Sequence, residues 1–159
     1  MTVLLDDRLK SFLHSPIMVI VATRDSHLKP AIARAAGARV RDDHLFDVFI
    51  SRSQWPVSIE HLLAEYTPVA VTCASPANYE TYQIKGHALS VTPTDDEDRK
   101  IAEGAISAAI SLFSSMGVPR SLADQWLTLE GLWRITIRAE AVFLQTPGPG
   151  AGQPRLEQA

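Results

Sequence analysis

The 159-residue sequence has little cysteine, no excess of positive charge and no long apolar run. Its single cysteine, Cys73, excludes an intrachain disulfide framework and is typical of a reducing, cytoplasmic compartment. The formal net charge of −3 gives no reason to expect nucleic acid or an anionic membrane as a partner. The apolar stretch at residues 17–22 is far too short to cross a bilayer, and no basic segment of a signal peptide precedes it. We therefore expect a cytoplasmic globular protein.

Familiar catalytic and metal-binding patterns are missing as well. The sequence contains no Gly-x-Ser-x-Gly elbow, no P-loop and no Rossmann glycine fingerprint. The histidines show no metal-ligand spacing, and no second cysteine exists for a zinc cluster; they are His14, His27, His44, His61 and His87. We expect no metal site, and no residue is a convincing general acid or base.

The hydrophobic pattern predicts a mainly β protein with helical insertions, an α+β chain. Strands are expected at residues 17–23, 30–40, 45–51, 69–74, 80–92 and 132–145. Helices are expected at residues 5–14, from Pro56 onward, from a capping box of Thr94 and Glu97 to Gly117, and at 121–127. Six strands with hairpin links predict an antiparallel six-stranded barrel over residues 1–146. Residues 147–159 form a Pro/Gly-rich tail.

The second predicted strand carries two arginines, Arg34 and Arg39, in a run of alanines and one glycine. Guanidinium groups suit an anionic ligand, and small side chains let a large flat group lie against the backbone. Paired surface charges, and tight packing at a barrel or dimer seam, are the alternative interpretations. Because side chains alternate along a strand, residues five apart should point to opposite faces. A bulge near Gly37 would re-aim one of them, and we predict an irregularity there.

The order of these elements resembles the pyridoxamine 5'-phosphate oxidase-like FMN-binding split-barrel family over about residues 5–146. The resemblance rests on Arg34 and Arg39, on a hydroxyl residue ending the third strand, and on the segment Ile84-Lys85-Gly86-His87-Ala88. The segments Thr23-Arg24-Asp25, Gln83-Ile84-Lys85-Gly86 and Gln145-Thr146-Pro147-Gly148-Pro149 look more specifically like a bacterial subgroup of flavin-binding proteins.

The resemblance implies a homodimer that binds FMN at the subunit interface. The cofactor-binding residues that it implies, together with the neighbouring small residues and loop residues, are Arg34, Ala35, Ala36, Arg39, Ser51, Arg52, Ser53, Gln54, Thr81, Gln83 and Lys85. Among them, Gln83 or Thr81 would contact the flavin of the partner subunit. Two features depart from the family. Ser53-Gln54-Trp55-Pro56 stands where a Ser-Arg-Lys-like run supplies phosphate ligands, and the C-terminal Trp and Arg-Leu segment is missing. Pyridoxal phosphate synthesis is therefore not expected.

Three functions remain open from the sequence. The first is an FMN-dependent oxidoreductase acting on an unknown small molecule, in which the flavin performs the redox chemistry. The second is a flavin or haem carrier or sensor without turnover. The third is a cofactor-free dimeric barrel, suggested by the altered segment after Ser53.

Overall fold

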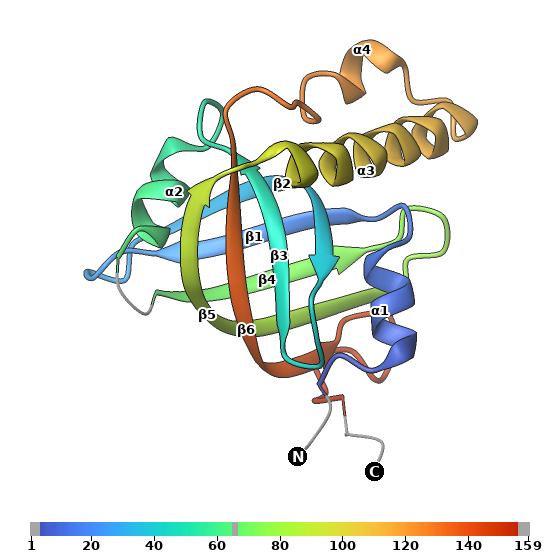
Figure 1. Ribbon diagram of the computed structural model, residues 1–159. Coiled ribbons are helices and arrows are strands. Elements are labelled where there is room, and N and C mark those ends of the chain that lie inside the picture. Colours follow the sequence, from blue (N-terminus) through green and yellow to red (C-terminus); the bar gives the residue numbers. More distant parts are fainter. Residues whose placement is uncertain (1–3, 65–66, 156–159) are drawn as a thin grey trace.

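A computed structural model describes residues 4–64 and 67–155 of the chain. The strands within these residues close into a barrel in the order β1-β2-β3-β6-β5-β4 (Figure 1). Every neighbouring pair is antiparallel. The elements are α1 (Asp7–Leu13), β1 (Met18–Arg24), β2 (Pro30–Val40), β3 (Leu45–Ser51), α2 (Pro56–Leu62), β4 (Pro68–Ala74), β5 (Thr81–Pro93), α3 (Asp96–Ser115), α4 (Arg120–Ala123) and β6 (Leu132–Leu144). The predicted antiparallel six-stranded barrel is confirmed.

The barrel core follows from alternating apolar residues on the strands. In β1 the inward positions Val19 and Val21 are buried, and the alternate residues Met18, Ile20 and Ala22 are half-buried. β3 differs because it is buried on both faces: Phe46 points into the barrel core, whereas Phe49 packs with residues of α3. Strands covered on both sides have nearly continuous apolar sequences, and β3 has one, interrupted between Leu45 and Ile50 by Asp47 alone.

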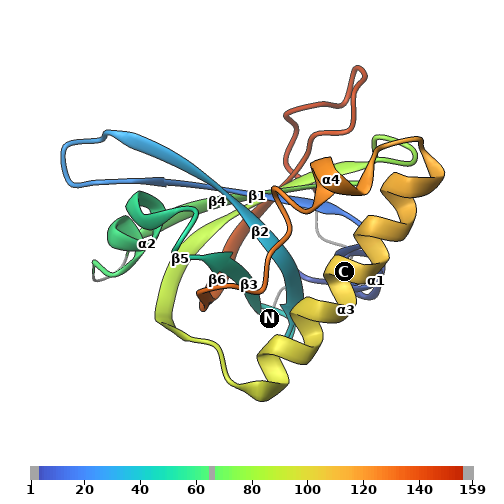
Figure 2. The ribbon, with the colours of Figure 1, turned by 90° about the horizontal axis from the view of Figure 1, so that it is seen from above.

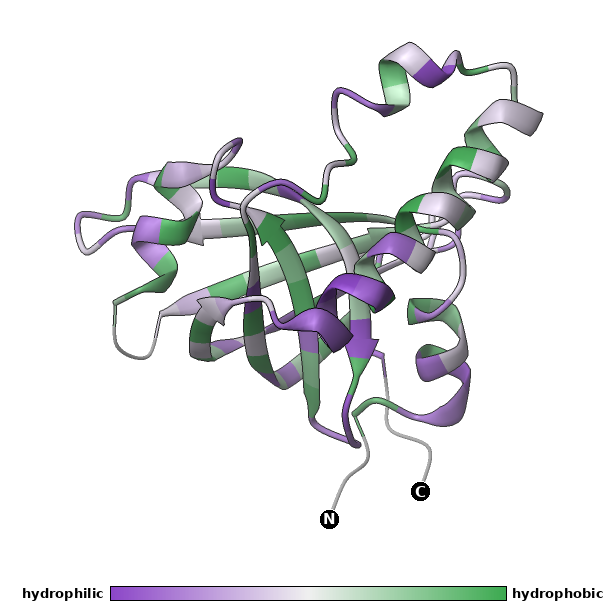
Figure 3. Ribbon diagram, turned by 45° about the horizontal axis from the view of Figure 1, so that its top comes forward, coloured by the Kyte–Doolittle hydropathy of each residue, from purple (hydrophilic) through white to green (hydrophobic). Residues whose placement is uncertain are grey.

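The helices occupy separate positions around the barrel. α1 and α2 lie on opposite sides of it (Figure 1), and each sends apolar side chains, such as Leu9 and Ile59, into the barrel core. Viewed from above, α3 runs along the outside of the barrel near β2 (Figure 2). Its first turns are hydrophilic, whereas the strands are largely hydrophobic (Figure 3). Different forces must therefore hold the two ends of α3 on the barrel.

The predicted irregularity near Gly37 is present. The pairing of β2 with β3 shifts between Ala35 and Ala38, which is the signature of a bulge. Both of these alanines contribute to the barrel core. Arg34 and Arg39 flank this bulged segment, and both contact residues outside the barrel wall. The extra residue of the bulge thus brings two side chains that are five positions apart to the same outer face.

The beginning of α3 corrects one prediction. The N-cap is Asp95 rather than Thr94, and the capping box pairs Asp95 with Asp98 rather than Thr94 with Glu97. The physical reason is that Thr94 still belongs to the strand region, since its backbone N–H and its Oγ1 both donate to the carbonyl oxygen of Leu132. The helix therefore begins one residue later. The predicted stop at Gly117 is confirmed, with a positive φ of 80° after the C-cap.

The chain beyond β6 folds back on the strand. The amide of Leu144 donates to Gln153, and the amide of Arg155 donates to Val142. The Arg155 guanidinium reaches Asp6, the N-cap of α1, at 2.7 Å. Residues 156–159 of the predicted tail lie outside the described residues, and the division of the chain at residue 146 remains a prediction.

Candidate functional site

A cavity of about 180 Å³ lies in the seam between β2 and α3. It is lined by residues 34–38 of β2, by small residues of α3 that include Gly104, Ala105 and Ala108, and by residues of the segment 13–19. α3 approaches β2 closely at Gly37, where an added Cβ would lie 2.6 Å from the Cβ of Ala105. Glycine at this position therefore allows α3 to approach the strand. The small residues 35–38 of β2 therefore pack tightly against a helix, and they also line the cavity.

Arg34 stands at the edge of this cavity. Its guanidinium carbon lies 4.5 Å from the centre of the Trp126 ring, a cation–π contact with the segment that follows α4. Within residues 4–64 and 67–155, no carboxylate forms an ion pair with Arg34. Its positive charge is therefore uncompensated at close range, which is the condition that favours an anionic ligand.

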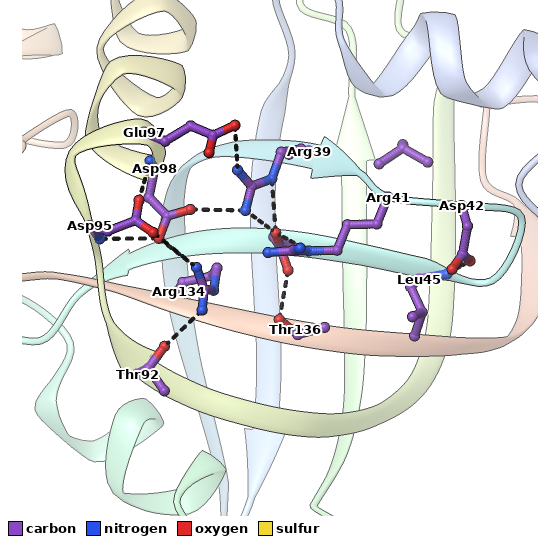
Figure 4. Close-up of polar contacts among 12 residues, drawn as sticks. Arg39, Arg41, Asp42, Leu45, Thr92, Asp95, Glu97, Asp98, Arg134 and Thr136 are labelled. Atoms are coloured by element: carbon purple, nitrogen blue, oxygen red, sulfur yellow. Dashed lines mark hydrogen bonds and ion pairs between the residues drawn. The ribbon is translucent and has the colours of Figure 1, made fainter.

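Arg39 has a different environment. Its Nε and Nη2 donate to Asp47 at 2.9 and 2.6 Å, and Nη2 also donates to Asp98 of α3 at 2.8 Å (Figure 4). Burial alone would lower the pKa of Arg39, but the carboxylates of Asp47 and Asp98 outweigh it and raise the pKa above its ordinary value. The charge of Arg39 is thus balanced by two carboxylates in this arrangement.

The same two aspartates collect further donors. Asp98 also accepts from Nη1 of Arg134 at 2.8 Å, and Asp47 accepts from Arg41 Nε and Thr136 Oγ1 (Figure 4). The side chains of Asp47 and Asp98 are 0% and 1% exposed. This network joins α3 to β2, β3 and β6, and it holds the hydrophilic end of α3. The sequence analysis missed it. The available signal was Asp47, an isolated charge inside an otherwise apolar strand.

The predicted residues after β3 meet the connection between α4 and β6. Ser51 Oγ donates to the carbonyl of Glu130 at 2.8 Å, and Gln54 Nε2 donates to the carbonyl of Gln125 at 3.0 Å. The guanidinium carbon of Arg52 lies 4.8 Å from the centre of the Trp133 ring. Ser53 packs so closely on Gly131 that a Cβ there would lie 2.4 Å from the serine hydroxyl. Local backbone contacts therefore occupy Ser51 and Gln54.

Arg34 and Arg52 emerge at the same part of the barrel. Ala35 pairs with Ile50, so Arg34 lies beside the end of β3, directly before Arg52. Like Arg34, Arg52 forms an aromatic contact and no ion pair with a described carboxylate. The structure thus brings two uncompensated arginines, from β2 and from the loop after β3, to one end of the barrel.

The remaining predicted residues lie elsewhere. Gln83 Nε2 donates to Thr72 at 3.2 Å, and Lys85 Nζ lies 4.8 Å from the centre of the Phe143 ring. Thr81 donates to the carbonyl of Tyr79. All three project from β5, which pairs with β4 and β6 but not with β2. Within one chain they are therefore not part of the Arg34 region, and their role at a partner's cofactor stays a prediction.

In the part of the chain that the structure describes, the other reactive groups form no second centre. Burial raises the pKa of Cys73 to about 12, so its thiol stays protonated at physiological pH. His87 Nδ1 lies 2.8 Å from Glu140, a residue at the irregular pairing of β5 with β6. The described residues contain no cluster of three or more His, Cys, Asp or Glu side chains arranged for a metal ion. Among the described helices, none has the length and hydropathy that a membrane span requires.

Comparison with known proteins identifies the fold but not a close relative. No protein-family model and no curated protein matches the chain. The structure is similar to HupZ from Group A Streptococcus, at 16% identity and a TM-score of 0.54, over 92% of this chain and 98% of HupZ. It is also similar to a candidate pyridoxamine 5'-phosphate oxidase from Lactobacillus delbrueckii, at 15% identity and a TM-score of 0.55, over 89% of this chain and 95% of that protein. The chain therefore has the split-barrel fold of the pyridoxamine 5'-phosphate oxidase-like proteins, as the sequence resemblance predicted.

Proposed function

We propose that the protein binds FMN and that the phosphate group of FMN lies between Arg34 and Arg52. The observation that carries this proposal is that both guanidinium groups lack a carboxylate partner within the described residues. Each guanidinium has one face against a tryptophan ring, so its N–H groups, which lie in the guanidinium plane, can donate to phosphate oxygens. Arg39, which already holds two carboxylates, is the weaker candidate in this arrangement.

The flavin ring needs more enclosure than one chain provides. The β2–α3 cavity, at about 180 Å³, is smaller than the roughly 300–1,000 Å³ of typical cofactor sites, so in this proposal the flavin ring lies outside it, against a second subunit. A homodimer would complete the site by presenting the Thr81, Gln83 and Lys85 face of β5 from the second subunit. In this proposal the protein fixes the phosphate and shields the ring, while the flavin supplies electron transfer to an unknown small molecule.

The first experiment is to record the absorbance spectrum of the purified protein before and after adding FMN. We expect a flavin spectrum or saturable FMN uptake. Replacing Arg34 or Arg52 by alanine should weaken FMN binding by about 1.5–3 kcal/mol each, the loss of a charge-assisted contact. The matched control is Arg24→Ala. Arg24 is an exposed arginine that pairs with Pro30, whereas Arg34 pairs with Ile20, four residues away along β1. A colourless protein without FMN affinity would refute the proposal.

A second measurement distinguishes an enzyme that turns over a substrate from a protein that only carries the flavin. Reduction of the bound flavin by NADH or NADPH supports an oxidoreductase, whereas a bound but unreactive flavin supports a carrier. A haem spectrum after haem addition, without FMN uptake, supports the haem alternative. The histidine that borders the cavity does not favour haem, since Nε2 of His14 already accepts the backbone N–H of Val40 at 3.1 Å.

A further inference from the structure

The cavity between β2 and α3 has the size of a single ring. At about 180 Å³ it is slightly larger than the roughly 150 Å³ engineered cavity that holds benzene in another protein. Ile101, Leu127 and Phe113 add apolar surface to the small residues that line it. An apolar ligand in this cavity would be stabilised by the removal of its surface from water.

The small residues that line the cavity favour a flat occupant. Ala36, Gly37, Gly104, Ala105 and Ala108 offer only methyl groups and backbone, and residues of the segment 13–19 form the remaining side. β2 and α3 are in contact at Gly37 and Ala105, so an occupant would lie beside that contact. A planar ring can lie flat on such a surface, whereas a puckered ring of the same atom count touches it with fewer atoms.

The charge around the cavity is positive. Neither aspartate nor glutamate is among the described residues that border it, whereas Arg34 stands at its edge with no carboxylate partner. Trp126 covers one face of the guanidinium, at 4.5 Å, and leaves the planar N–H edge as donor. A carboxylate is the group that matches this edge with two parallel hydrogen bonds.

We propose that the β2–α3 cavity binds a monocyclic aromatic carboxylate. The ring would lie on the small residues of β2 and α3 that line the cavity, and the carboxylate would pair with Arg34. The ring position lies outside the proposed flavin site, but FMN and the carboxylate both need Arg34 and would compete for it, so benzoate is titrated into protein without bound FMN. The two proposals are therefore separated by a change to the cavity wall that leaves Arg34 intact.

The test is isothermal titration calorimetry of the purified protein with benzoate as the probe. We expect saturable binding at one site per chain. Ala108→Leu, which places a larger side chain in the cavity wall, should weaken benzoate binding at least about tenfold, or 1.4 kcal/mol, and leave FMN binding unchanged. Ser107→Leu is the matched control, because Ser107 is the adjacent exposed residue of α3 and does not border the cavity; it should change neither affinity.

Charge and shape are tested separately. Arg34→Gln should weaken benzoate at least about tenfold and leave the weaker binding of neutral benzyl alcohol unchanged. Cyclohexanecarboxylate, which has the same charge and a puckered ring, should bind less well than benzoate. Circular dichroism confirms that each variant is folded. The proposal is overturned if benzoate shows no saturable binding, if Ala108→Leu binds it as tightly as the unaltered protein, or if cyclohexanecarboxylate binds equally well.

Discussion

Removal of the Asp98 carboxylate should loosen α3 and destabilise the whole protein. Asp98 accepts hydrogen bonds from Arg39 and Arg134, both at 2.8 Å, and from the backbone amide of Asp95 at 3.2 Å. The variant Asp98→Ala deletes all three contacts. It leaves Arg39 with Asp47, whereas Arg134 keeps the Thr92 hydroxyl at 3.4 Å and the exposed carboxylate of Asp95 at 3.7 Å.

The magnitude follows from these contacts. A hydrogen bond to a charged group contributes about 1.5–3 kcal/mol, so the two arginine contacts give a gross loss of about 3–6 kcal/mol. Water recovers part of it, because the side chains of Arg39 and Arg134 remain 17% and 22% exposed. Removing one partner of a buried ion pair typically costs about 3–5 kcal/mol, and partial exposure places this variant at about 2–4 kcal/mol.

Equilibrium urea unfolding, followed by far-ultraviolet circular dichroism, measures this loss. With a slope of about 1–3 kcal/mol per molar urea, the midpoint should fall by roughly 0.7–4 M. The control is Glu97→Ala. Glu97 is the neighbouring residue, its side chain is 81% exposed, and it lies 4.0 Å from Arg39, so its removal should cost under about 0.5 kcal/mol. A loss below about 1 kcal/mol for Asp98→Ala would show that the network does not hold α3.

Three further outcomes are expected. Gly86→Ala should cost about 2–3 kcal/mol in urea unfolding, because its Cβ would lie 1.9 Å from the carbonyl oxygen of Arg138; a variant within about 0.5 kcal/mol would contradict the packing. Burial alone would raise the pKa of Asp6, but hydrogen bonds from Arg155 and the Leu9 amide outweigh it, so the pKa lies below its ordinary value. The stabilisation by Asp6 is therefore complete above the unfolded-state pKa and disappears as the pH falls through the folded-state pKa, and the stability difference between wild type and Asp6→Asn should shrink as the pH falls below about 4. Cys73 should not react with a thiol reagent at about pH 8 until the protein is unfolded, and rapid labelling of the native state would contradict its burial.

The local features of the fold were predictable because their chemistry lies within a few neighbouring residues. Alternating and continuous apolar runs predicted the strands, and Gly117 predicted the end of α3. The bulge in β2 was predictable as well, since the spacing of Arg34 and Arg39 conflicted with the alternation of a regular strand. The N-cap of α3 was missed by one residue because Thr94 donates to the carbonyl of Leu132 at the start of β6, which is a long-range contact.

In the candidate site, too, the local sequence predicted some features and long-range contacts decided the others. The sequence by itself determined which residues could bind an anion: Arg34 and Arg39, beside a run of small side chains. Only the tertiary structure decided which of the two is free to do so. Arg39 meets Asp98, which is 59 residues away in the chain, and Arg34 meets Trp126. A guanidinium has the same charge in either place, but the elements that fold against it determine whether a carboxylate compensates that charge. Partners so far apart in the sequence leave no local pattern from which they could be paired.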